Sequence, residues 1–172
     1  MWPLYEDWLS AEDAQFVEKV RLLSRLSDAE LFAALDIRPA FRGGSGGGGG
    51  GGQAEEARRS PYEGASAALS QLEAAFSPGR GCVPREAMEA LAGAQLEMKT
   101  CALEAAGGQA ELHSMDDVMP VFVFVLARSA LARPFAYARY LQDSLSQDER
   151  LDCEGRAVLL LESAARHIAF HR

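Results

Sequence analysis

The sequence predicts an all-α protein, and three observations favour this fold class. Apolar residues recur at three- and four-residue spacing through most of the chain, as they do on the buried face of an α-helix. A serine followed three residues later by a glutamate, a pattern typical of helix N-termini, twice precedes such a stretch. Clusters of glycine and proline separate the stretches. These patterns predict about seven helices in a single domain over residues 1–172.

Two helices are expected before a glycine-rich segment. Ser10 is placed to cap a helix that runs to about Leu26, since apolar side chains at helical spacing follow it. Residues Ser27–Glu30 form a capping-box sequence, which Leu26 and Leu31 flank as a hydrophobic staple would. The box predicts a second, short helix through Leu35. The apolar residues expected on the buried face of the first helix are Phe16, Val20 and Leu23.

The sharpest change in composition is the glycine-rich segment itself. From Gly43 to Gly52 only Ser45 interrupts the glycines, and Gln53–Arg59 continue the polar stretch. Glycine loses more backbone entropy on folding than other residues and has no side chain to bury in return. A phosphate-binding loop would end in Gly-Lys-Ser/Thr, which is absent here. Residues 43–59 are therefore expected to be a disordered, flexible insertion within the domain.

Two longer helices are expected after this insertion. Ser60, Pro61 and Glu63 repeat the pattern of a cap, a proline at the first helical position and an acidic residue. Pro84 begins the next helix, and Gly107–Gly108 are expected to end it as a C-cap. The apolar residues expected on the buried faces are Ala65, Leu69, Leu72 and Phe76 in the first helix, and Met88, Leu91, Ala94, Met98, Cys101 and Ala105 in the second.

The following segment is ambiguous locally. Val118–Ala127 are ten consecutive apolar residues, and within them Val121–Val125 have the β-propensity of a strand. The length of the segment to Leu131, and the helices expected on both sides, favour a helix that is buried all round. Helices over Phe135–Leu145 and Glu154–Phe170 complete the set. The core residues expected in the last helix are Val158, Leu161, Ala165 and Ile168.

The composition excludes several function classes. A net charge of −8 argues against a nucleic-acid binder, which would carry a basic face. Residues Met1–Asp7 are acidic and lack the apolar core of a secretory signal, and no apolar run reaches the ~18 residues of a membrane helix. The three cysteines have no metal-type spacing. A cytoplasmic protein with reduced thiols and no integral membrane segment is expected.

The candidate functional residues are Asp116 and Asp117, which directly precede the apolar run. One interpretation is a helix cap, because Asp117 follows Ser114 by three residues and the helix dipole favours anions there. The other is a carboxylate presented to a partner. Adjacent helical residues point about 100° apart, so the pair would not face each other across a substrate. His167 and His171 lack the glutamate and third ligand of a zinc site, so neither metal nor cofactor is expected.

Several residues together resemble the vacuolar-protein-sorting-nine (Vps-nine) domain, the catalytic module of guanine-nucleotide exchange factors for early-endosomal Rab GTPases. The resemblance centres on Asp116, Asp117 and Pro120, followed by the apolar run 121–126. Further segments are similar to helices of the family and occur in its order, namely 83–88, 135–141 with Tyr140, 154–155 and 161–165, and more loosely 14–37.

The resemblance implies a layered all-helical domain that promotes GDP release from a Rab-family GTPase in endocytic membrane traffic. The family's acidic residue maps to Asp117, which would reach into the nucleotide site, compete with phosphate for a lysine and disfavour magnesium. The signature helix and the closing helix would form an apolar groove for the GTPase. The partner is the GDP-bound or nucleotide-free GTPase, and recruitment to early endosomes is expected. The partner-binding residues that the resemblance implies are Asp116, Pro120, Tyr140, Gly155 and Ala157.

The sequence also departs from the family. The functional tyrosine of the closing helix falls on Ala157, the threonine falls on Leu159, and an asparagine after the signature helix falls on Tyr137. Ala157 supplies neither the ring nor the hydroxyl of the family residue. Two alternatives therefore stand beside an exchange factor. One is a Rab-binding module of the same fold without exchange activity, and the other is a helical scaffold unrelated to GTPases, in which Asp117 only caps a helix.

Overall fold

The computed structural model describes residues 2–43, 60–76, 83–146 and 152–170. Within these ranges the chain forms eight α-helices, one short 3-10 helix and no strand, so the predicted all-α class is confirmed. Residues 44–59, most of the predicted insertion, lie outside the described residues. The elements are α1 (Trp2–Trp8), α2 (Ser10–Leu23), α3 (Asp28–Ala34), η1 (Pro39–Phe41), α4 (Glu63–Ala75), α5 (Pro84–Ala105), α6 (Met115–Arg128), α7 (Pro134–Ser144) and α8 (Cys153–Phe170).

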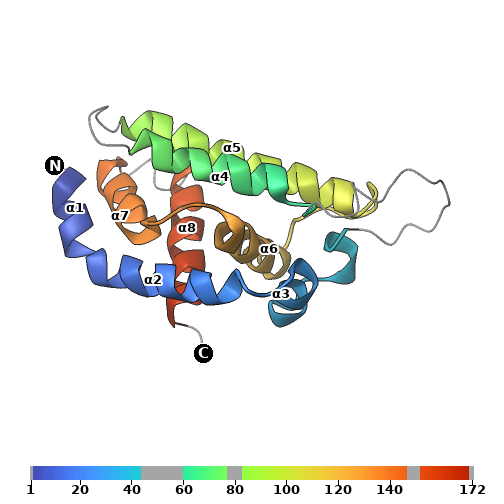
Figure 1. Cartoon of the computed structure of the whole chain (residues 1–172). Helices are drawn as coiled ribbons and strands as arrows, with labels where there is room; N and C mark the ends of the chain where they lie inside the picture. The colour runs from blue at the N-terminus through green and yellow to red at the C-terminus, as the bar shows by residue number, and fades with distance from the viewer. Residues whose placement is uncertain (1, 44–59, 77–82, 147–151, 171–172) are drawn as a thin grey trace.

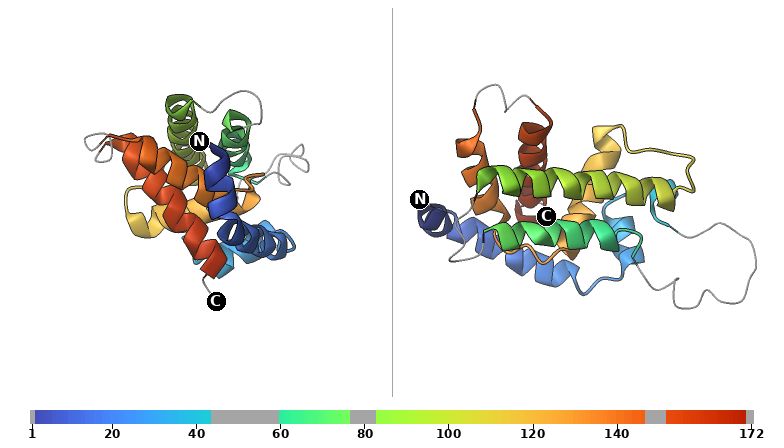
Figure 2. Two further views of the ribbon diagram at one scale, coloured as in Figure 1. Left: turned by 90° about the vertical axis from the view of Figure 1, so that its left-hand side faces the viewer. Right: turned by 90° about the horizontal axis from the view of Figure 1, so that it is seen from above.

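The helices pack in layers around α6 and α8. Helices α4 and α5 form an antiparallel pair on one side, and α2 and α3 lie on the other, with α6, α7 and α8 between them (Figures 1 and 2). Helix α8 contacts α2, α5, α6 and α7, and α6 contacts α2, α4, α5 and α8. Over the described ranges, no helix is both long and apolar enough to cross a membrane.

Helix α6 is the buried centre of this arrangement. All seven residues from Val121 to Ala127 are buried, so the segment is a helix that is apolar on every side. The strand suggested by the β-propensity of Val121–Val125 does not form. Helices α2, α4, α5 and α8 pack against α6, and such packing overrides local propensity. Ser114 caps the helix, because its Oγ accepts a 3.2 Å hydrogen bond from the backbone N–H of Asp116.

Two predicted helix signals are confirmed. Ser27 Oγ accepts from Glu30 N, and Ser27 N donates to the Glu30 carboxylate, so the capping box is complete. Gly107 and Gly108 have φ values of +58° and +75° and end α5 as a Schellman motif, in which Gly108 N donates to Leu103 O over 2.8 Å. Such positive φ values favour glycine, which has no Cβ.

Two other predicted caps are wrong. Ser10 is the first residue inside α2, and its hydroxyl donates to Asp7 O. The reason is that α1, a helix the sequence did not predict, leads directly into α2. Helix α4 begins at Glu63 rather than at Pro61, and Ser60 Oγ accepts only a long 3.5 Å bond from Tyr62 N. Tyr62 is instead fully buried at this entry, where its ring packs against Phe32. In both places the start of the helix is determined by a tertiary contact or a neighbouring helix, and not by the serine that the sequence pattern marks as a cap.

Candidate functional site

The Asp117 carboxylate is already bonded within the fold. Asp117 is the third residue of α6, and its Oδ2 lies 2.7 Å from Nη1 of Arg38, which comes from the segment between α3 and η1. The Asp117 side chain is 12% exposed, whereas that of Arg38 is 58% exposed. The helix is capped by Ser114, and the Asp117 carboxylate, which was one candidate for the cap, is bonded to Arg38. It forms an ion pair between residues 79 positions apart.

The segment that carries Arg38 is itself anchored. The Arg38 guanidinium lies over the ring of buried Phe41, 5.4 Å from its centre. The hydroxyl of Tyr62 donates a 2.7 Å hydrogen bond to Phe41 O, and burial raises the pKa of this tyrosine above its ordinary value. Arg42 Nε donates to Ile37 O over 2.6 Å. Arg38 thus approaches Asp117 from a fixed piece of backbone.

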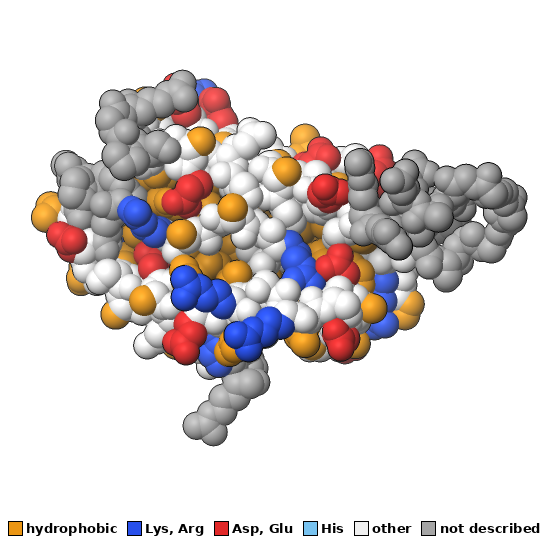
Figure 3. Space-filling model, viewed as in Figure 1, with side chains coloured by type: hydrophobic (Ala, Val, Ile, Leu, Met, Phe, Trp, Pro, Cys, Tyr) orange, Lys and Arg blue, Asp and Glu red, His pale blue; other side chains and the backbone are white. Residues whose placement is uncertain are grey.

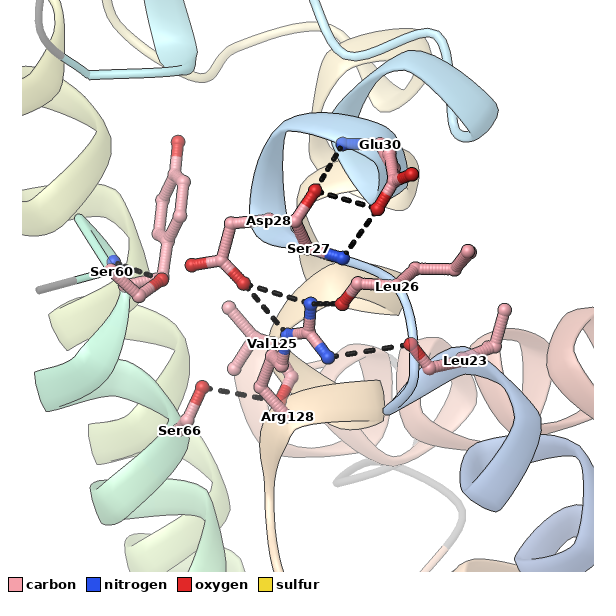
Figure 4. Close-up of polar contacts among 10 residues, drawn as sticks. Leu23, Leu26, Ser27, Asp28, Glu30, Ser60, Ser66, Val125 and Arg128 are labelled. Carbon is pink, nitrogen blue, oxygen red and sulfur yellow. Dashed lines mark hydrogen bonds and ion pairs between the residues drawn. The ribbon is translucent and has the colours of Figure 1, made fainter. Parts of the chain in front are cut away.

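The same face of α6 makes two further contacts with the α2–α3 region. Residues 117, 124 and 128 lie within roughly 40° of one another around a helix. The ring of Phe124 stacks on Phe32 of α3, with the ring centres 4.4 Å apart. Figure 4 shows the Arg128 guanidinium between the Asp28 carboxylate, 2.8 Å away, and the carbonyl oxygens of Leu23 and Leu26. This face of α6 therefore belongs to the internal structure of the domain.

Asp116 lies on a different face of α6 and is exposed. Within the part of the chain that the structure describes, no hydrogen bond or ion pair engages its carboxylate. Residues 116, 120 and 123 lie within roughly 60° of one another around a helix, so Asp116 heads a stripe that continues through half-buried Pro120 to Val123. Met115, just before it, is 62% exposed. This stripe is the face of α6 that reaches the surface at its N-terminus.

Val123 forms part of the wall of an apolar groove. The groove has a volume of about 440 Å³ and lies between α2, α3, α6 and α8. Leu22 and Leu35 line it from one side and Ile168 from the other, while Lys19 and His167 are its only ionisable lining residues. Over α2 and α4, the face drawn in Figure 3 shows acidic, basic and apolar side chains interspersed, without a patch of one sign. Shape and apolar area, rather than a strong charge, therefore characterise the groove.

The other predicted site residues lie apart from the acidic pair. Gly155 and Ala157 are buried where α8 packs on α5, and Ala157 O accepts a 3.2 Å hydrogen bond from Gln95 Nε2. A contribution of Ala157 to a partner site would be indirect, through the spacing of α5 and α8. Tyr140 of α7 is half-buried, and its ring packs edge-on against Tyr5 of α1 and against Phe76 at the end of α4. Helix α7 lies at the opposite end of the molecule from α3 (Figure 1).

Pro120 lies inside α6, beyond its first turn. It is the sixth residue of the helix, beyond the first turn in which N–H groups have no partner. Because proline has no N–H, the carbonyl of Asp116 loses the hydrogen bond that an ordinary residue would provide. The structure thus brings Asp116, Asp117 and Pro120 together on one turn of helix, while Tyr140, Gly155 and Ala157 lie elsewhere.

The most perturbed carboxyl group, Asp13, was not anticipated. It is 5% exposed and accepts hydrogen bonds from Phe135 N at 2.9 Å and Ala136 N at 3.4 Å, so it caps α7 from α2. Burial raises its pKa to about 7, although the two hydrogen bonds oppose the rise. An open cavity of about 790 Å³ lies beside it, lined also by Arg21 and Arg133. No local sequence signal links Asp13 to a helix start 121 positions away.

The described residues place an exposed carboxylate, Asp116, at the head of an apolar stripe. No group of three or more histidine, cysteine or acidic side chains in these ranges is placed to hold a metal ion. An exposed carboxylate at the head of an apolar stripe can attract a cation or repel an anion on a partner that covers the stripe. No family model matches the chain, and no curated protein matches it.

Proposed function

We propose that this chain is a Vps-nine-like module that binds an early-endosomal-type Rab GTPase and promotes the release of GDP. The observation that carries the proposal is the unpaired Asp116 carboxylate at the N-terminus of the central helix, at the head of the stripe that leads to the apolar groove between α2, α3, α6 and α8. The layered all-α architecture and the order of the family-like segments along the chain support it. Recruitment to early endosomes and a part in endocytic traffic belong to the same proposal.

Asp116 is the carboxylate that geometry favours for the partner. Asp117 would have to leave Arg38 before it could reach a nucleotide site, whereas Asp116 is exposed and free of such a bond among the described residues. The role that the resemblance gives to Asp117 stays a prediction. The two residues differ by about 100° of rotation around α6, so replacing each in turn separates the two assignments.

The physical mechanism is electrostatic competition. When the apolar stripe is covered by a GTPase, water leaves and the carboxylate interacts more strongly with nearby charges. A carboxylate beside the phosphates of GDP repels them and attracts the lysine that holds them. Weakening nucleotide binding by about 4 kcal/mol would shift the affinity by roughly a thousandfold. No covalent chemistry by this chain is involved in the proposal.

The test is the release of fluorescent GDP from a panel of Rab GTPases. We expect the wild-type chain to accelerate release from at least one of them, and Asp116→Asn to abolish the acceleration. Because Asp116 is exposed, its replacement should leave the unfolding free energy within about 0.5 kcal/mol of wild type. Glu104→Gln, which removes an exposed acidic charge at the end of α5, is the matched control and should stay active. A wild-type chain that accelerates no Rab contradicts the proposal.

Binding without exchange is the second candidate, and the burial of Ala157 favours it. The position that holds a tyrosine in the family is closed here by the packing of α5 on α8. A tyrosine introduced at Ala157 would collide with this packing, so restoring the family residue is not a usable test. The discriminating measurement is to compare capture of a Rab by the chain with the rate of GDP release from the same Rab. Capture with an unchanged release rate supports binding alone.

A further inference from the structure

The first turn of α6 is held by fewer backbone bonds than an ordinary helix start. Ser114 O accepts from both Asp117 N and Val118 N, and Ser114 Oγ accepts from Asp116 N. Two residues further on, the bond that residue 120 would donate to Asp116 O is absent because residue 120 is proline. The carbonyl that loses its partner belongs to the residue whose side chain faces outward. With one backbone bond fewer, side-chain contacts contribute more to holding this turn in place.

Arg38 supplies such a contact. Its guanidinium bonds Asp117, the neighbour of Asp116, and the segment behind it is fixed by Phe41 and Tyr62. Since the two carboxylates are separated by about 100° around the helix, holding one of them inward determines where the other points. An arginine also keeps its charge at every physiological pH, so the contact does not depend on proton uptake.

We propose that Arg38 is a positioning residue: its ion pair holds the Asp117 side chain inside the fold and thereby directs the Asp116 side chain toward the partner. This inference rests on the proposed function of the acidic pair. Its structural half is that the ion pair fixes the first turn of α6. Its functional half is that the fixed turn raises the exchange rate without contributing much to partner affinity.

The experiment compares Arg38→Gln, Asp117→Asn and the double variant, with Arg85→Gln as the matched control. Arg85 is an arginine of α5 whose partner, Glu89, lies on the same helix, so its loss removes one positive charge far from the acidic pair. Hydrogen exchange of the amides of residues 115–118 should be faster in Arg38→Gln and in Asp117→Asn, and unchanged in Arg85→Gln. This first measurement needs no GTPase.

The second measurement is GDP release at increasing concentrations of the chain. Each single variant should lower the saturating release rate by roughly three- to tenfold, and the double variant should lower it no further, as expected for residues that act through one contact. The concentration at half-saturation should stay within about twofold, because the partner surface is intact. Arg38→Lys, which keeps the charge, should recover most of the rate.

The outcomes separate the inference from the proposed function. If wild type accelerates release and Arg38→Gln is unchanged in rate and in amide exchange, the positioning role is refuted while the proposed function stands. A higher release rate in Arg38→Gln also refutes the positioning role, because it would mean that the ion pair keeps Asp117 from reaching the partner. Loss of all activity in Asp117→Asn with full activity in Arg38→Gln would make Asp117 itself the acting carboxylate. If neither the wild type nor any variant acts on any Rab, the proposed function fails, and with it the claim that Arg38 raises the exchange rate. The claim that the ion pair fixes the first turn of α6 is then decided by amide exchange alone.

Discussion

The buried carboxyl group of Asp13 gives this domain a pH dependence of stability with a definite sign. The pKa of Asp13 is raised from an ordinary value of 3.8 to about 7, first because burial disfavours the charged form. The acidic side chains of Glu12 and Glu73 add to the rise, and the N–H groups of Phe135 and Ala136 oppose it. The folded state therefore binds a proton more tightly than the unfolded state between about pH 4 and pH 7.

The stabilisation that this proton gives is present below about pH 4 and is lost as the pH rises through about 7. A rise of the pKa from 3.8 to about 7 corresponds to roughly 4 kcal/mol at about 1.4 kcal/mol per pKa unit. Asp13→Asn removes the titration and keeps a side-chain oxygen for the start of α7. The unfolding free energy of the variant minus that of wild type should therefore rise by up to about 4 kcal/mol from pH 4 to pH 8.

Urea unfolding followed by circular dichroism, at one-unit steps from about pH 4 to pH 8, measures this difference. Subtracting the two curves removes the contributions of all other carboxyl groups, including those with lowered pKa values such as Glu30 and Glu162. Glu104→Gln is the control for an exposed carboxylate, and its difference curve should be flat. A flat curve for Asp13→Asn, or one that falls as the pH rises, would refute the reasoning.

Two further stability predictions follow from the contacts of α6 and the end of α5. Arg128→Met should cost about 3 kcal/mol in urea unfolding, because it removes a largely buried guanidinium that bonds Asp28 and the carbonyl oxygens of Leu23 and Leu26. Arg38→Gln should cost below about 1 kcal/mol, because Arg38 is 58% exposed and forms a single ion pair. Equal losses would contradict this ranking. Gly108→Ala should cost about 1 kcal/mol at a φ of +75°, while Gly93→Ala, inside α5 with open space around it, should stabilise by about 0.5–1 kcal/mol. Thermal unfolding of both glycine variants checks the opposite signs.

The parts of the fold that the sequence predicts correctly are those in which the cause is local. The capping box at Ser27 and the glycine pair at the end of α5 involve residues within one turn of each other, so their chemistry is visible in the sequence. The periodic apolar residues of α4, α5 and α8 are likewise buried, except Ala105 at the very end of α5. A helix buried on all sides has no periodicity, and α6 could be assigned only through its length and its neighbours.

The failures share a physical cause, which is competition from a contact distant in sequence. Ser60 carries the same signal as Ser27, yet the entry to α4 is governed by Tyr62, whose hydroxyl bonds Phe41 O across the aromatic cluster. The ion pair of Arg38 and Asp117 has no local signature, because its two residues meet only after α3 and α6 have packed. The sequence thus singled out the acidic pair at the start of α6, but not which of its two carboxylates is bonded within the fold.

A helix that is apolar on every side can carry charge only at its ends, and each charge there needs a reason. Asp117 at the start of α6 and Arg128 at its end both suit the helix dipole, and each is bonded to an oppositely charged residue of the α2–η1 region. Their presence is explained by the fold. Asp116 adds a second negative charge in the same first turn, where the dipole also favours it, but its carboxylate makes no ion pair within the described ranges. That exposed carboxylate, without a bonded partner among the described residues, is the reason for proposing Asp116, rather than Asp117, as the residue that faces a partner, and this reason is independent of any resemblance to a family.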